Sequence, residues 1–551
     1  MSTALRNGAR AAAVMEQEVP AHEAATVYLR SEGVGLAIAV MAVSLLVGYD
    51  LVFRLHQVYG DAMSRVLTGL YITWGGQFHL AAMSFYWSPL ISLLSIPFAL
   101  VRHVWPPLMT YGFTANILSA SFAAVGAYHI NRLFWRFGLP AWARVALTLL
   151  YAFNPLILLY SGNGMSDQME CALVIASAEN MVAYLQTGRL TDITKAGSWL
   201  AAAFMVRYES VPIGAGMGMG LTLAVWRYER NWQKANAVAI AFLLPVFAAG
   251  IIWILLGWMI MHDPLYFLNS RYSNGAQIAS GTYNFPQVMA ARHNIGITLY
   301  QVVFFSVNFI PYFPALIAVA VMQLRRRPDP IGLPLILGSL GAPLLQVALL
   351  YTHRSADWQR FFIYYVPFGV MLCGYLLWRV RRPWRFAALA GACVLFLFAD
   401  YVTLQAMRSR VWGNGDTTPT ALVLGTHRVK TFHTVNDYSS IYSGQVEGAY
   451  VNAHPGLRVL VSTFQSWPMM AYIHDPKQVI FSNQMDFRSV LLNPRGRANA
   501  ILTVPDNSFS KQNDTINAVY PALWSGRVGW TKLIHQFPNG DRVFAILPTA
   551  P

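Results

Sequence analysis

The chain has 551 residues, of which 56% are hydrophobic and 11% are charged, and its formal net charge is +15. Soluble domains have about 25% charged residues, so this composition excludes an ordinary soluble protein and indicates an integral membrane protein. The positive charge fits cytoplasmic loops rich in Lys and Arg, and we expect no nucleic-acid partner.

Residues 1–33 are predicted to form a cytosolic tail. Charged residues interrupt the Ala-rich segment there, unlike the apolar core of a cleavable signal peptide. Residues 34–53 are the first of many apolar runs that approach the roughly 20 residues needed to cross a bilayer. The run at residues 89–104 is predicted to be a short or re-entrant helix.

Basic connections alternate with non-basic ones over residues 34–406, the predicted transmembrane module. Because Lys and Arg collect on the cytoplasmic side, we expect about eleven crossings, with twelve or thirteen as alternatives. The N-terminus would then be cytosolic and the C-terminus extracytoplasmic. The segments assigned to the cytoplasm are residues 131–136 with Arg144, 188–195, 227–234, 325–327 and 379–385.

The first external loop, residues 54–88, is long enough to act as a catalytic lid. Four apolar residues recur in it at helical spacing: Met63, Leu67, Leu70 and Trp74. They predict a helix on the membrane surface with one apolar face. Asp61 at its start is either an N-cap with Arg65 as its ion-pair partner or a general base at the interface.

Two further segments place acids and a cation beside the membrane, where ionisable groups are costly. Asp167 and Glu170 have capping-box spacing at the head of a helix, or Asp167 is a second carboxylate that faces the same cavity as Asp61. Arg207 either pairs with Glu209 or binds an anion such as a lipid phosphate.

Two outer connections, residues 262–274 and 353–360, supply more Arg and His. They are either solvated loops with aromatic residues at the membrane interface or part of a phosphate-binding site. The candidates in them are His262, Arg271, Tyr272, Arg354 and Arg360.

Residues 407–551 contain no run that could span a membrane and are predicted to form a small α/β domain. Strands are expected at 458–462, 479–482, 500–504 and 543–547, and helices near 467–473 and 513–524. This alternation favours a sheet that is at least partly parallel. No G-x-G-x-x-G motif, phosphate loop or metal motif is seen, and all three cysteines lie outside this domain.

Together these features resemble the GT-C superfamily of membrane glycosyltransferases. Besides Asp61 and the outer α/β tail, the resemblance rests on Trp87-Ser88-Pro89, Asn154-Pro155, Asn163-Gly-Met-Ser166, Arg207-Tyr208-Glu209, Asp263-Pro264 and Arg360-Phe361 followed by Pro367. Protein O-mannosyltransferases and lipid A aminoarabinose transferases are similar in architecture. The sequence has Gly-Asp-Ala where many members have Asp-Glu, and it has no motif for an acceptor peptide, which leaves the acceptor and the subfamily open.

The resemblance implies an all-α GT-C-type membrane bundle with surface helices in the first loop and an extracytoplasmic α/β domain. It also implies inverting transfer of a sugar from a polyprenyl-phosphate donor to a hydroxyl of an envelope glycan, glycolipid or protein. The catalytic candidates are Asp61 and Asp167. The candidates for binding the donor phosphate or substrate are Arg65, Arg207, Glu209, His262, Arg271, Tyr272, Arg354 and Arg360.

We expect no cofactor and no dedicated metal ligands, while a dependence on a divalent metal stays open. The expected location is the cytoplasmic membrane of a bacterium, in contact with membrane lipids.

A secondary transporter or a flippase for lipid-linked glycans is the main alternative function. Against it, the charges cluster at one face and the two halves of the chain do not match. A scaffold that displays the outer domain would leave the clustered acids and arginines unexplained.

Overall fold

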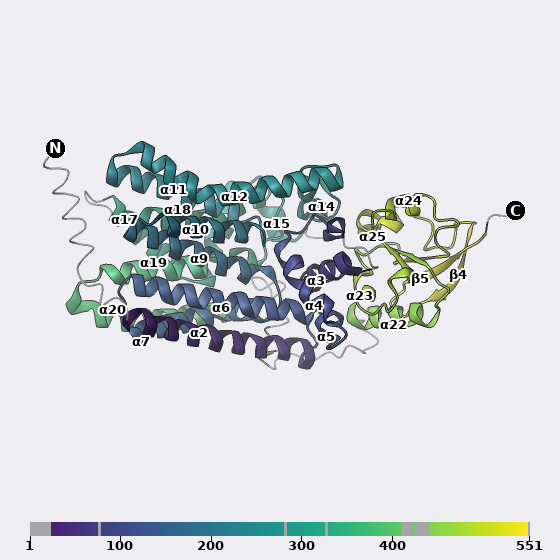
Figure 1. The fold of residues 1–551 in the computed structure, drawn as a ribbon, viewed down its shortest axis with the longest axis horizontal. Coiled ribbons are helices and arrows are strands. Elements are labelled where there is room, and N and C mark those ends of the chain that lie inside the picture. Colours follow the sequence, from purple (N-terminus) through teal and green to yellow (C-terminus); the bar gives the residue numbers. More distant parts are fainter. Residues whose placement is uncertain are drawn as a thin grey trace.

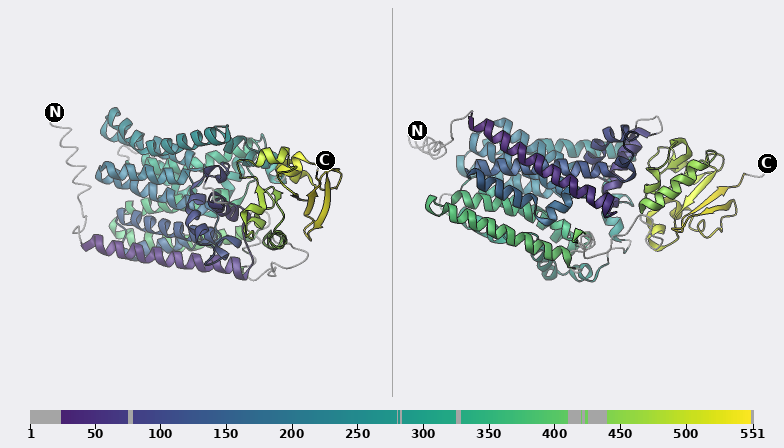
Figure 2. Two further views of the ribbon diagram at one scale, coloured as in Figure 1. Left: turned by 45° about the vertical axis from the view of Figure 1, so that its right-hand side comes forward. Right: turned by 90° about the horizontal axis from the view of Figure 1, so that it is seen from below.

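The computed structural model describes residues 24–74, 79–279, 281, 284–324, 329–409, 420, 423–424 and 440–548. A long helical bundle carries a small α/β domain at one end, and the first described helix begins at the other end (Figures 1 and 2). This is the predicted fold class. The basic segment at residues 325–327 and most of the predicted N-terminal tail lie outside the described residues.

The bundle is built from long helices that run side by side (Figure 1). They are α2 (Ala24–Tyr49), α6 (Phe113–Arg136), α7 (Ala141–Ala152), α8 (Pro155–Gly162), α9 (Ser166–Thr187), α10 (Leu190–Phe204), α11 (Ser210–Glu229), α12 (Trp232–Met261), α16 (Ile295–Phe304), α17 (Tyr312–Gln323), α18 (Gly332–Tyr351), α19 (Tyr365–Arg379) and α20 (Arg382–Arg408). Shorter elements join them, namely η1 (Asp50–Arg54), α13 (Tyr266–Asn269), α14 (Asn274–Ala279), α15 (Pro286–Ala291), η4 (Phe305–Asn308) and η5 (Gln359–Phe362).

Within the described residues, five helices are long and apolar enough to cross a membrane, and seven spans result if two bent pairs each count as one. The bends measure 67° between α7 and α8 and 103° between the α16–η4 segment and α17. Several spans are therefore present, and the expected total of about eleven stays a prediction.

Two boundaries at the start of the bundle bear on the predictions. The first helix begins at Ala24, before the predicted start at residue 34, and Glu32 in it pairs with Arg144. The run expected to be short is α4 (Leu90–Leu100), whose 11 residues reach only about 16 Å at 1.5 Å per residue. It is thus too short to cross roughly 30 Å of hydrocarbon.

The first external loop forms α3 (Gly60–Thr73) and η3 (Leu80–Met83), and the short α5 (Pro107–Thr110) follows α4. The predicted helix is present, but its apolar residues face protein instead of lipid. Met63 and Leu67 are fully buried, and Trp74 packs its ring 5.5 Å from that of Phe481 in the C-terminal domain. The helix is therefore enclosed between α4, α6 and the C-terminal domain, not laid on the membrane surface.

The C-terminal domain holds a five-stranded sheet in the order β2-β1-β3-β5-β4. The strands are β1 (Val459–Val461), β2 (Val479–Phe481), β3 (Ala500–Thr503), β4 (Thr531–Gln536) and β5 (Arg542–Ile546). The helices are α22 (Ser440–Ala453), α23 (Trp467–Met470), η7 (Pro476–Gln478), α24 (Phe487–Leu492), α25 (Ser508–Asn513) and α26 (Thr515–Val519). Strands β1, β2 and β3 are parallel and β5 is antiparallel to its neighbours, so the mixed sheet agrees with the prediction.

The C-terminal domain is attached to the first external loop by polar and aromatic contacts. Asn483 donates from Nδ2 to the carbonyl of Ala82 at 3.1 Å and also to the hydroxyl of Ser84. The Tyr472 hydroxyl donates to the carbonyl of Thr110 at 3.1 Å. These contacts place the sheet directly against the loop that carries Asp61.

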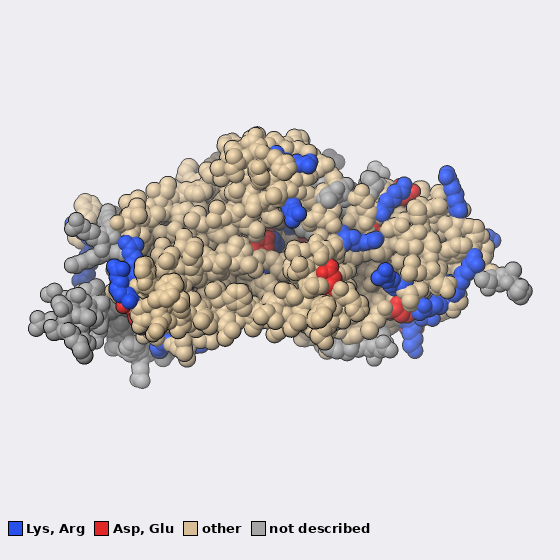
Figure 3. Space-filling model, turned by 90° about the horizontal axis from the view of Figure 1, so that it is seen from above, with Lys and Arg blue, Asp and Glu red and all other residues tan. Residues whose placement is uncertain are grey.

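The other end of the bundle holds a separate group of charges. Residues 131–136, expected in a loop, form the last turns of α6, and Arg136 and His129 bind the fully buried Glu179 of α9. On the face shown in Figure 3, a stretch of surface without Lys, Arg, Asp or Glu lies between the charges at this end and those toward the C-terminal domain. Such a stretch is what a bilayer core requires.

Candidate functional site

The connection between α10 and α11 carries Arg207, whose guanidinium meets three carboxylates. Its Nη1 is 3.0 Å from Asp167 Oδ1, and its Nε is 3.5 Å from Glu170 Oε2. Its Nη2 pairs with Glu209 Oε1. The two acids of α9 lie in its first two turns and Glu209 directly precedes α11, so one cation joins the starts of two helices.

Two hydroxyl groups complete this cluster. Nη1 of Arg207 also donates to Ser166 Oγ at 3.2 Å, and the Tyr364 hydroxyl, just before α19, donates to Glu170 Oε2. Burial disfavours a charge on Arg207, but Asp167 and then Glu209 outweigh it and hold the pKa of Arg207 above its ordinary value. Arg207 therefore stays charged as the centre of a buried ion network.

This geometry decides between the alternatives for these residues. The N-cap position of α9 is Met165, and no side chain caps the helix. Asp167 and Glu170 are 1% and 0% exposed and turn toward Arg207, so they do not form a capping box. The pair between Arg207 and Glu209 is present, and the three carboxylates leave Arg207 poorly suited to bind a phosphate.

Asp61 stands in the first turn of α3, but it does not act as an N-cap. The N-cap position is Tyr59, and no side chain caps this helix. The Asp61 carboxylate points to another segment, with Oδ2 3.5 Å from Nη2 of Arg360, and its side chain is 42% exposed. The N-cap interpretation of Asp61 is therefore wrong, and its carboxylate lies at the surface of a cavity.

Arg65, one turn further along α3, does not use its guanidinium to pair with the Asp61 carboxylate. It donates instead to the main-chain carbonyl of Asp61 at 3.3 Å and lies over the ring of Trp87, 4.1 Å from its centroid. Burial lowers the pKa of Arg65 to about 10, which leaves it protonated at neutral pH. Arg65 thus adds positive charge behind Asp61.

Arg360 in η5 faces Asp61 from the opposite side, and its surroundings are mostly apolar. The guanidinium lies 4.2 Å from the centroid of Trp358 and donates to the sulfur of Met165 at 3.9 Å, a weak acceptor. Its buried Nε has no hydrogen-bond partner among the described residues. Among the described residues, the ion pair of this nearly buried cation is the long one to Asp61, and the charge of Asp167 also stabilises the charged guanidinium of Arg360.

A cavity of about 270 Å³ opens between these two residues. Its lining residues are Tyr59, Gly60, Asp61, Tyr160, Met165, Trp358 and Arg360. Met165, which touches Arg360, is followed by Ser166, which accepts a hydrogen bond from Arg207. The start of α9 therefore connects the ion network of Arg207 to the wall of the cavity.

The remaining candidates do not line this cavity or join the ion network of Arg207. His262 ends α12, and His262, Arg271 and Arg354 are exposed. Tyr272 stacks on Phe464 of the C-terminal domain at 5.2 Å and contacts Tyr86 in the first loop. The structure thus brings Asp61, Asp167, Arg207, Glu209 and Arg360 to one end of the bundle, with Arg65 behind them.

Several residues of the site were not selected from the sequence. They are Tyr59, Tyr160, Met165, Ser166, Glu170, Trp358 and Tyr364. Glu170 and Tyr364 both lie within segments in which the sequence indicates site residues, 163–170 and 360–367. An acid next to a membrane helix needs a cation, and that need is the signal that could have linked Glu170 to Arg207. Within the described ranges, no three His, Cys, Asp or Glu residues form a group that could hold a metal ion.

Solved structures resemble this chain along nearly its full length. ArnT from Cupriavidus metallidurans bound to undecaprenyl phosphate matches with a TM-score of 0.53 at 13% identity, over 93% of this chain and 98% of that chain. Its apo state matches with a TM-score of 0.52 at 14% identity, over the same shares. The archaeal oligosaccharyltransferase AglB from Archaeoglobus fulgidus, in complex with an inhibitory peptide and a dolichol-phosphate, has a lower TM-score of 0.44 at 11% identity, over 93% of this chain and 74% of that chain.

The sequence matches no protein-family model and no curated protein. The structural likeness nevertheless shows that the chain shares its fold with ArnT, and its apolar helices make it an integral membrane protein. At this level of identity the likeness fixes the fold alone, so the function has to be argued from the site.

Replacing Arg207 by Ala should destabilise the protein severely. The change leaves Asp167, Glu170 and Glu209 without their cation, and breaking a buried ion pair in this way typically costs about 3–5 kcal/mol. The measurement is the thermal unfolding midpoint of the purified protein in detergent, with Arg271→Ala as the matched control because Arg271 is exposed. Equal midpoints for the two variants would show that the ion network does not support the fold.

Proposed function

We propose that the protein transfers a sugar from a polyprenyl-phosphate donor to a hydroxyl of an acceptor, with inversion at the anomeric carbon. The observation that carries the proposal is the pairing of Arg360, a nearly buried cation without a strong acceptor among the described residues, with the carboxylate of Asp61 across a cavity. An arginine in such surroundings is complementary to an anion, and its planar donors suit phosphate oxygens.

Arg207 and Arg360 have different roles in the site. Arg207 is surrounded by carboxylates and stabilises the fold, whereas Arg360 meets one carboxylate at 3.5 Å. We therefore assign the donor phosphate to Arg360 in place of Arg207. When the phosphate binds, it replaces Asp61 on the guanidinium and frees the carboxylate for the acceptor.

The proposed step balances without a cofactor. The acceptor hydroxyl oxygen attacks the anomeric carbon, a new glycosidic bond forms, and the bond from that carbon to the phosphate oxygen breaks. Asp61 accepts the proton of the hydroxyl, and the electron pair of the broken bond leaves with the polyprenyl phosphate. Arg360, with Arg65 nearby, stabilises the charge that develops on this leaving group.

The proposal implies two partners, a donor lipid and an acceptor. The donor is a polyprenyl phosphate that carries a sugar, and the acceptor is a glycan, glycolipid or protein. ArnT from Cupriavidus metallidurans binds undecaprenyl phosphate in its crystal structure, which supports a lipid of this class here. The long apolar helices beside the cavity would let such a lipid enter from the bilayer.

Asp61→Asn should fold normally and lose transfer by about 10²–10⁴-fold, because an amide cannot accept the proton that the carboxylate takes. The measurement is release of polyprenyl phosphate from a labelled lipid-linked sugar by the purified protein. Asp263→Asn serves as the control, since Asp263 lies outside the site in the loop after α12. Near-normal transfer by Asp61→Asn would remove Asp61 from the mechanism.

Arg360→Lys should keep the charge but lose the planar donor geometry, and Arg360→Gln should lose both. We expect weaker use of the donor in the first variant and near-complete loss of transfer in the second, with unfolding midpoints close to that of the unaltered protein. The control is Arg354→Gln, an exposed residue of the same connection. Normal donor use by Arg360→Gln would contradict the phosphate assignment.

We further propose that the site faces the extracytoplasmic side. Cysteines introduced at Ser525, exposed in the C-terminal domain, and at Arg189, exposed between α9 and α10 at the other end of the bundle, test this in intact cells. An impermeant thiol reagent should label Ser525→Cys and not Arg189→Cys, because Lys and Arg collect inside. The reverse pattern would overturn the orientation.

A further inference from the structure

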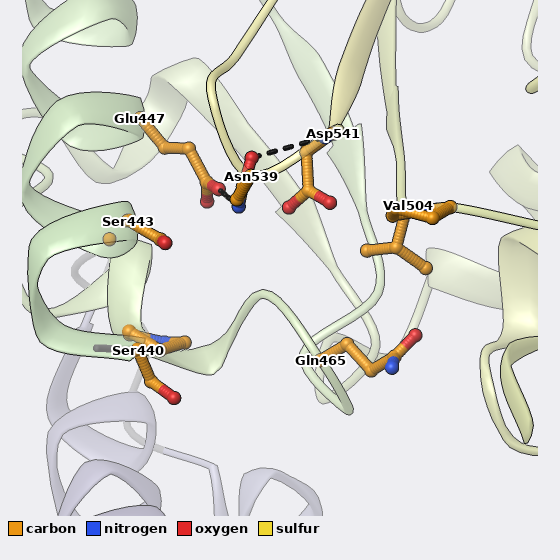
Figure 4. A pocket seen from close by; sticks show the side chains of 10 residues that line it. Ser440, Ser443, Glu447, Gln465, Val504, Asn539 and Asp541 are labelled. Carbon is orange, nitrogen blue, oxygen red and sulfur yellow. Dashed lines mark hydrogen bonds between the residues drawn. The ribbon is translucent and has the colours of Figure 1, made fainter. Parts of the chain in front are cut away.

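The C-terminal domain contains a second cavity, of about 330 Å³, which is separate from the cavity between Asp61 and Arg360. It lies where the parallel strands β1 and β3 end, a position at which α/β sheets commonly bind ligands. The lining residues are Ser440, Ser443, Gly444, Glu447, Gln465, Pro468, Val504, Pro505, Asn539 and Asp541. Figure 4 shows Glu447, Asn539 and Asp541 directed toward one another on one wall.

Two glycines give the cavity its shape. A Cβ on Gly444 would lie 2.4 Å from the carbonyl carbon of Pro468, so only glycine lets α22 approach α23 this closely. Gly540 has a φ of +92°, a conformation that other residues rarely adopt. It turns the chain between β4 and β5 so that Asn539 and Asp541 face Glu447.

One wall of the cavity is polar and holds two buried acids. Glu447 and Asp541 are 2% and 7% exposed, and Asn539 donates from Nδ2 to Glu447 Oε1 at 2.9 Å. Burial, and then the nearby Asp541, raises the pKa of Glu447 well above its ordinary value. Burial also raises the pKa of Asp541 to about 6. The two acids supply acceptors, and the amide group of Asn539 beside them adds a hydrogen-bond donor.

Further polar groups face the cavity without a cation among them. Ser440 and Ser443 supply hydroxyl groups from α22, and the buried Oε1 of Gln465 has no hydrogen-bond partner among the described residues. None of the ten lining residues is Lys, Arg or His. An anion such as a phosphate is therefore disfavoured, and the mixture of donors and acceptors suits a neutral ligand with several hydroxyl groups.

We propose that this cavity binds a neutral sugar unit. Its volume is at the lower end of the roughly 300–1,000 Å³ of typical ligand pockets, which suits a small ligand. Amide, hydroxyl and carboxyl groups can each form a hydrogen bond with a sugar hydroxyl. The unpartnered Gln465 oxygen is then bound by a ligand hydroxyl instead of being left buried without a partner.

The cavity lies close in space to the proposed active site, although the two are far apart in the chain. Pro468 in its wall follows Trp467, whose ring would lie 3.5 Å from a Cβ placed on Gly60, the residue before Asp61. A sugar in the cavity is therefore held beside the start of α3. We assign it to the acceptor glycan, an assignment that rests on the proposed transfer reaction, whereas sugar binding itself does not.

The test is binding of free monosaccharides to the full-length protein in detergent without any lipid donor. The probes are glucose, galactose, mannose and N-acetylglucosamine, measured by saturation-transfer NMR and calorimetry. We expect at least one to bind with a Kd of about 1 mM, equivalent to about −4 kcal/mol. Ser443→Trp should fill the cavity and weaken binding at least about tenfold, and Gln445→Trp on the exposed side of the same helix should not.

Two outcomes would overturn the proposal. One is that none of the four sugars binds, and the other is that Ser443→Trp binds them as well as Gln445→Trp does. If the protein binds Ca²⁺ or Mg²⁺ but none of the sugars, and Ser443→Trp abolishes this binding, the cavity is a cation site instead of a sugar site. Glu447→Gln and Asp541→Asn, which keep the shape of the wall, should alter affinity even if Ser443→Trp folds poorly.

The same experiment separates this inference from the proposed transfer reaction. Asp61→Asn should bind the monosaccharide as well as the unaltered protein does, because Asp61 does not line the cavity. If transfer proves absent while the sugar still binds, the proposed function fails and the sugar site stands. If transfer is normal in Ser443→Trp, the site exists but does not hold the acceptor.

Discussion

The organisation of the site depends on the ion network around Arg207. A guanidinium in the interior of a membrane protein is costly unless it is paired, and here Asp167, Glu170 and Glu209 surround that of Arg207. Because these acids come from the starts of α9 and α11, the network fixes where both helices begin. The Tyr364 hydroxyl bound to Glu170 adds the segment before α19. The position of Arg360, four residues earlier, follows from this attachment.

The contrast between Arg207 and Arg360 shows how one residue type can serve two purposes. Both side chains are 12% exposed, so exposure does not distinguish them. Their partners do, since Arg207 has strong acceptors on several of its donors and Arg360 has the rings of Trp358 and Phe361, a sulfur and one distant carboxylate. The Nε of each arginine lacks a hydrogen-bond partner among the described residues, so the difference is that three carboxylates surround Arg207 whereas Arg360 meets one beside a cavity.

Much of the fold could be predicted from the sequence, because apolar runs and basic connections carry the information directly. Four of the five strands follow from runs of β-branched and aliphatic residues. The missed strand, β4, lies at the edge of the sheet and carries Lys532, His535 and Gln536, as edge strands often carry polar residues. Helix α22 was also missed, because its sequence is polar and contains Gly444 and Gly448.

The candidate site was predicted less completely, for a physical reason. The cost of placing charges near lipid predicted which residue types form the site and that they gather at one end of the bundle. The pairings could not be predicted in this way, because they join segments far apart in the chain, such as Arg360 with Asp61. Local patterns instead suggested caps for Asp61 and Asp167, which the structure does not contain. Spacing alone also could not decide that three carboxylates surround Arg207 while Arg360 meets one.

The most direct test of the central claim is a cryo-EM structure of the protein in lipid nanodiscs with an added polyprenyl phosphate. The account predicts phosphate density in the cavity between Asp61 and Arg360, with phosphate oxygens within hydrogen-bond distance of the Arg360 guanidinium and the Arg207 network unchanged. Phosphate bound to Arg207 with its carboxylates displaced, or bound only at the exposed Arg271 or Arg354, would contradict it.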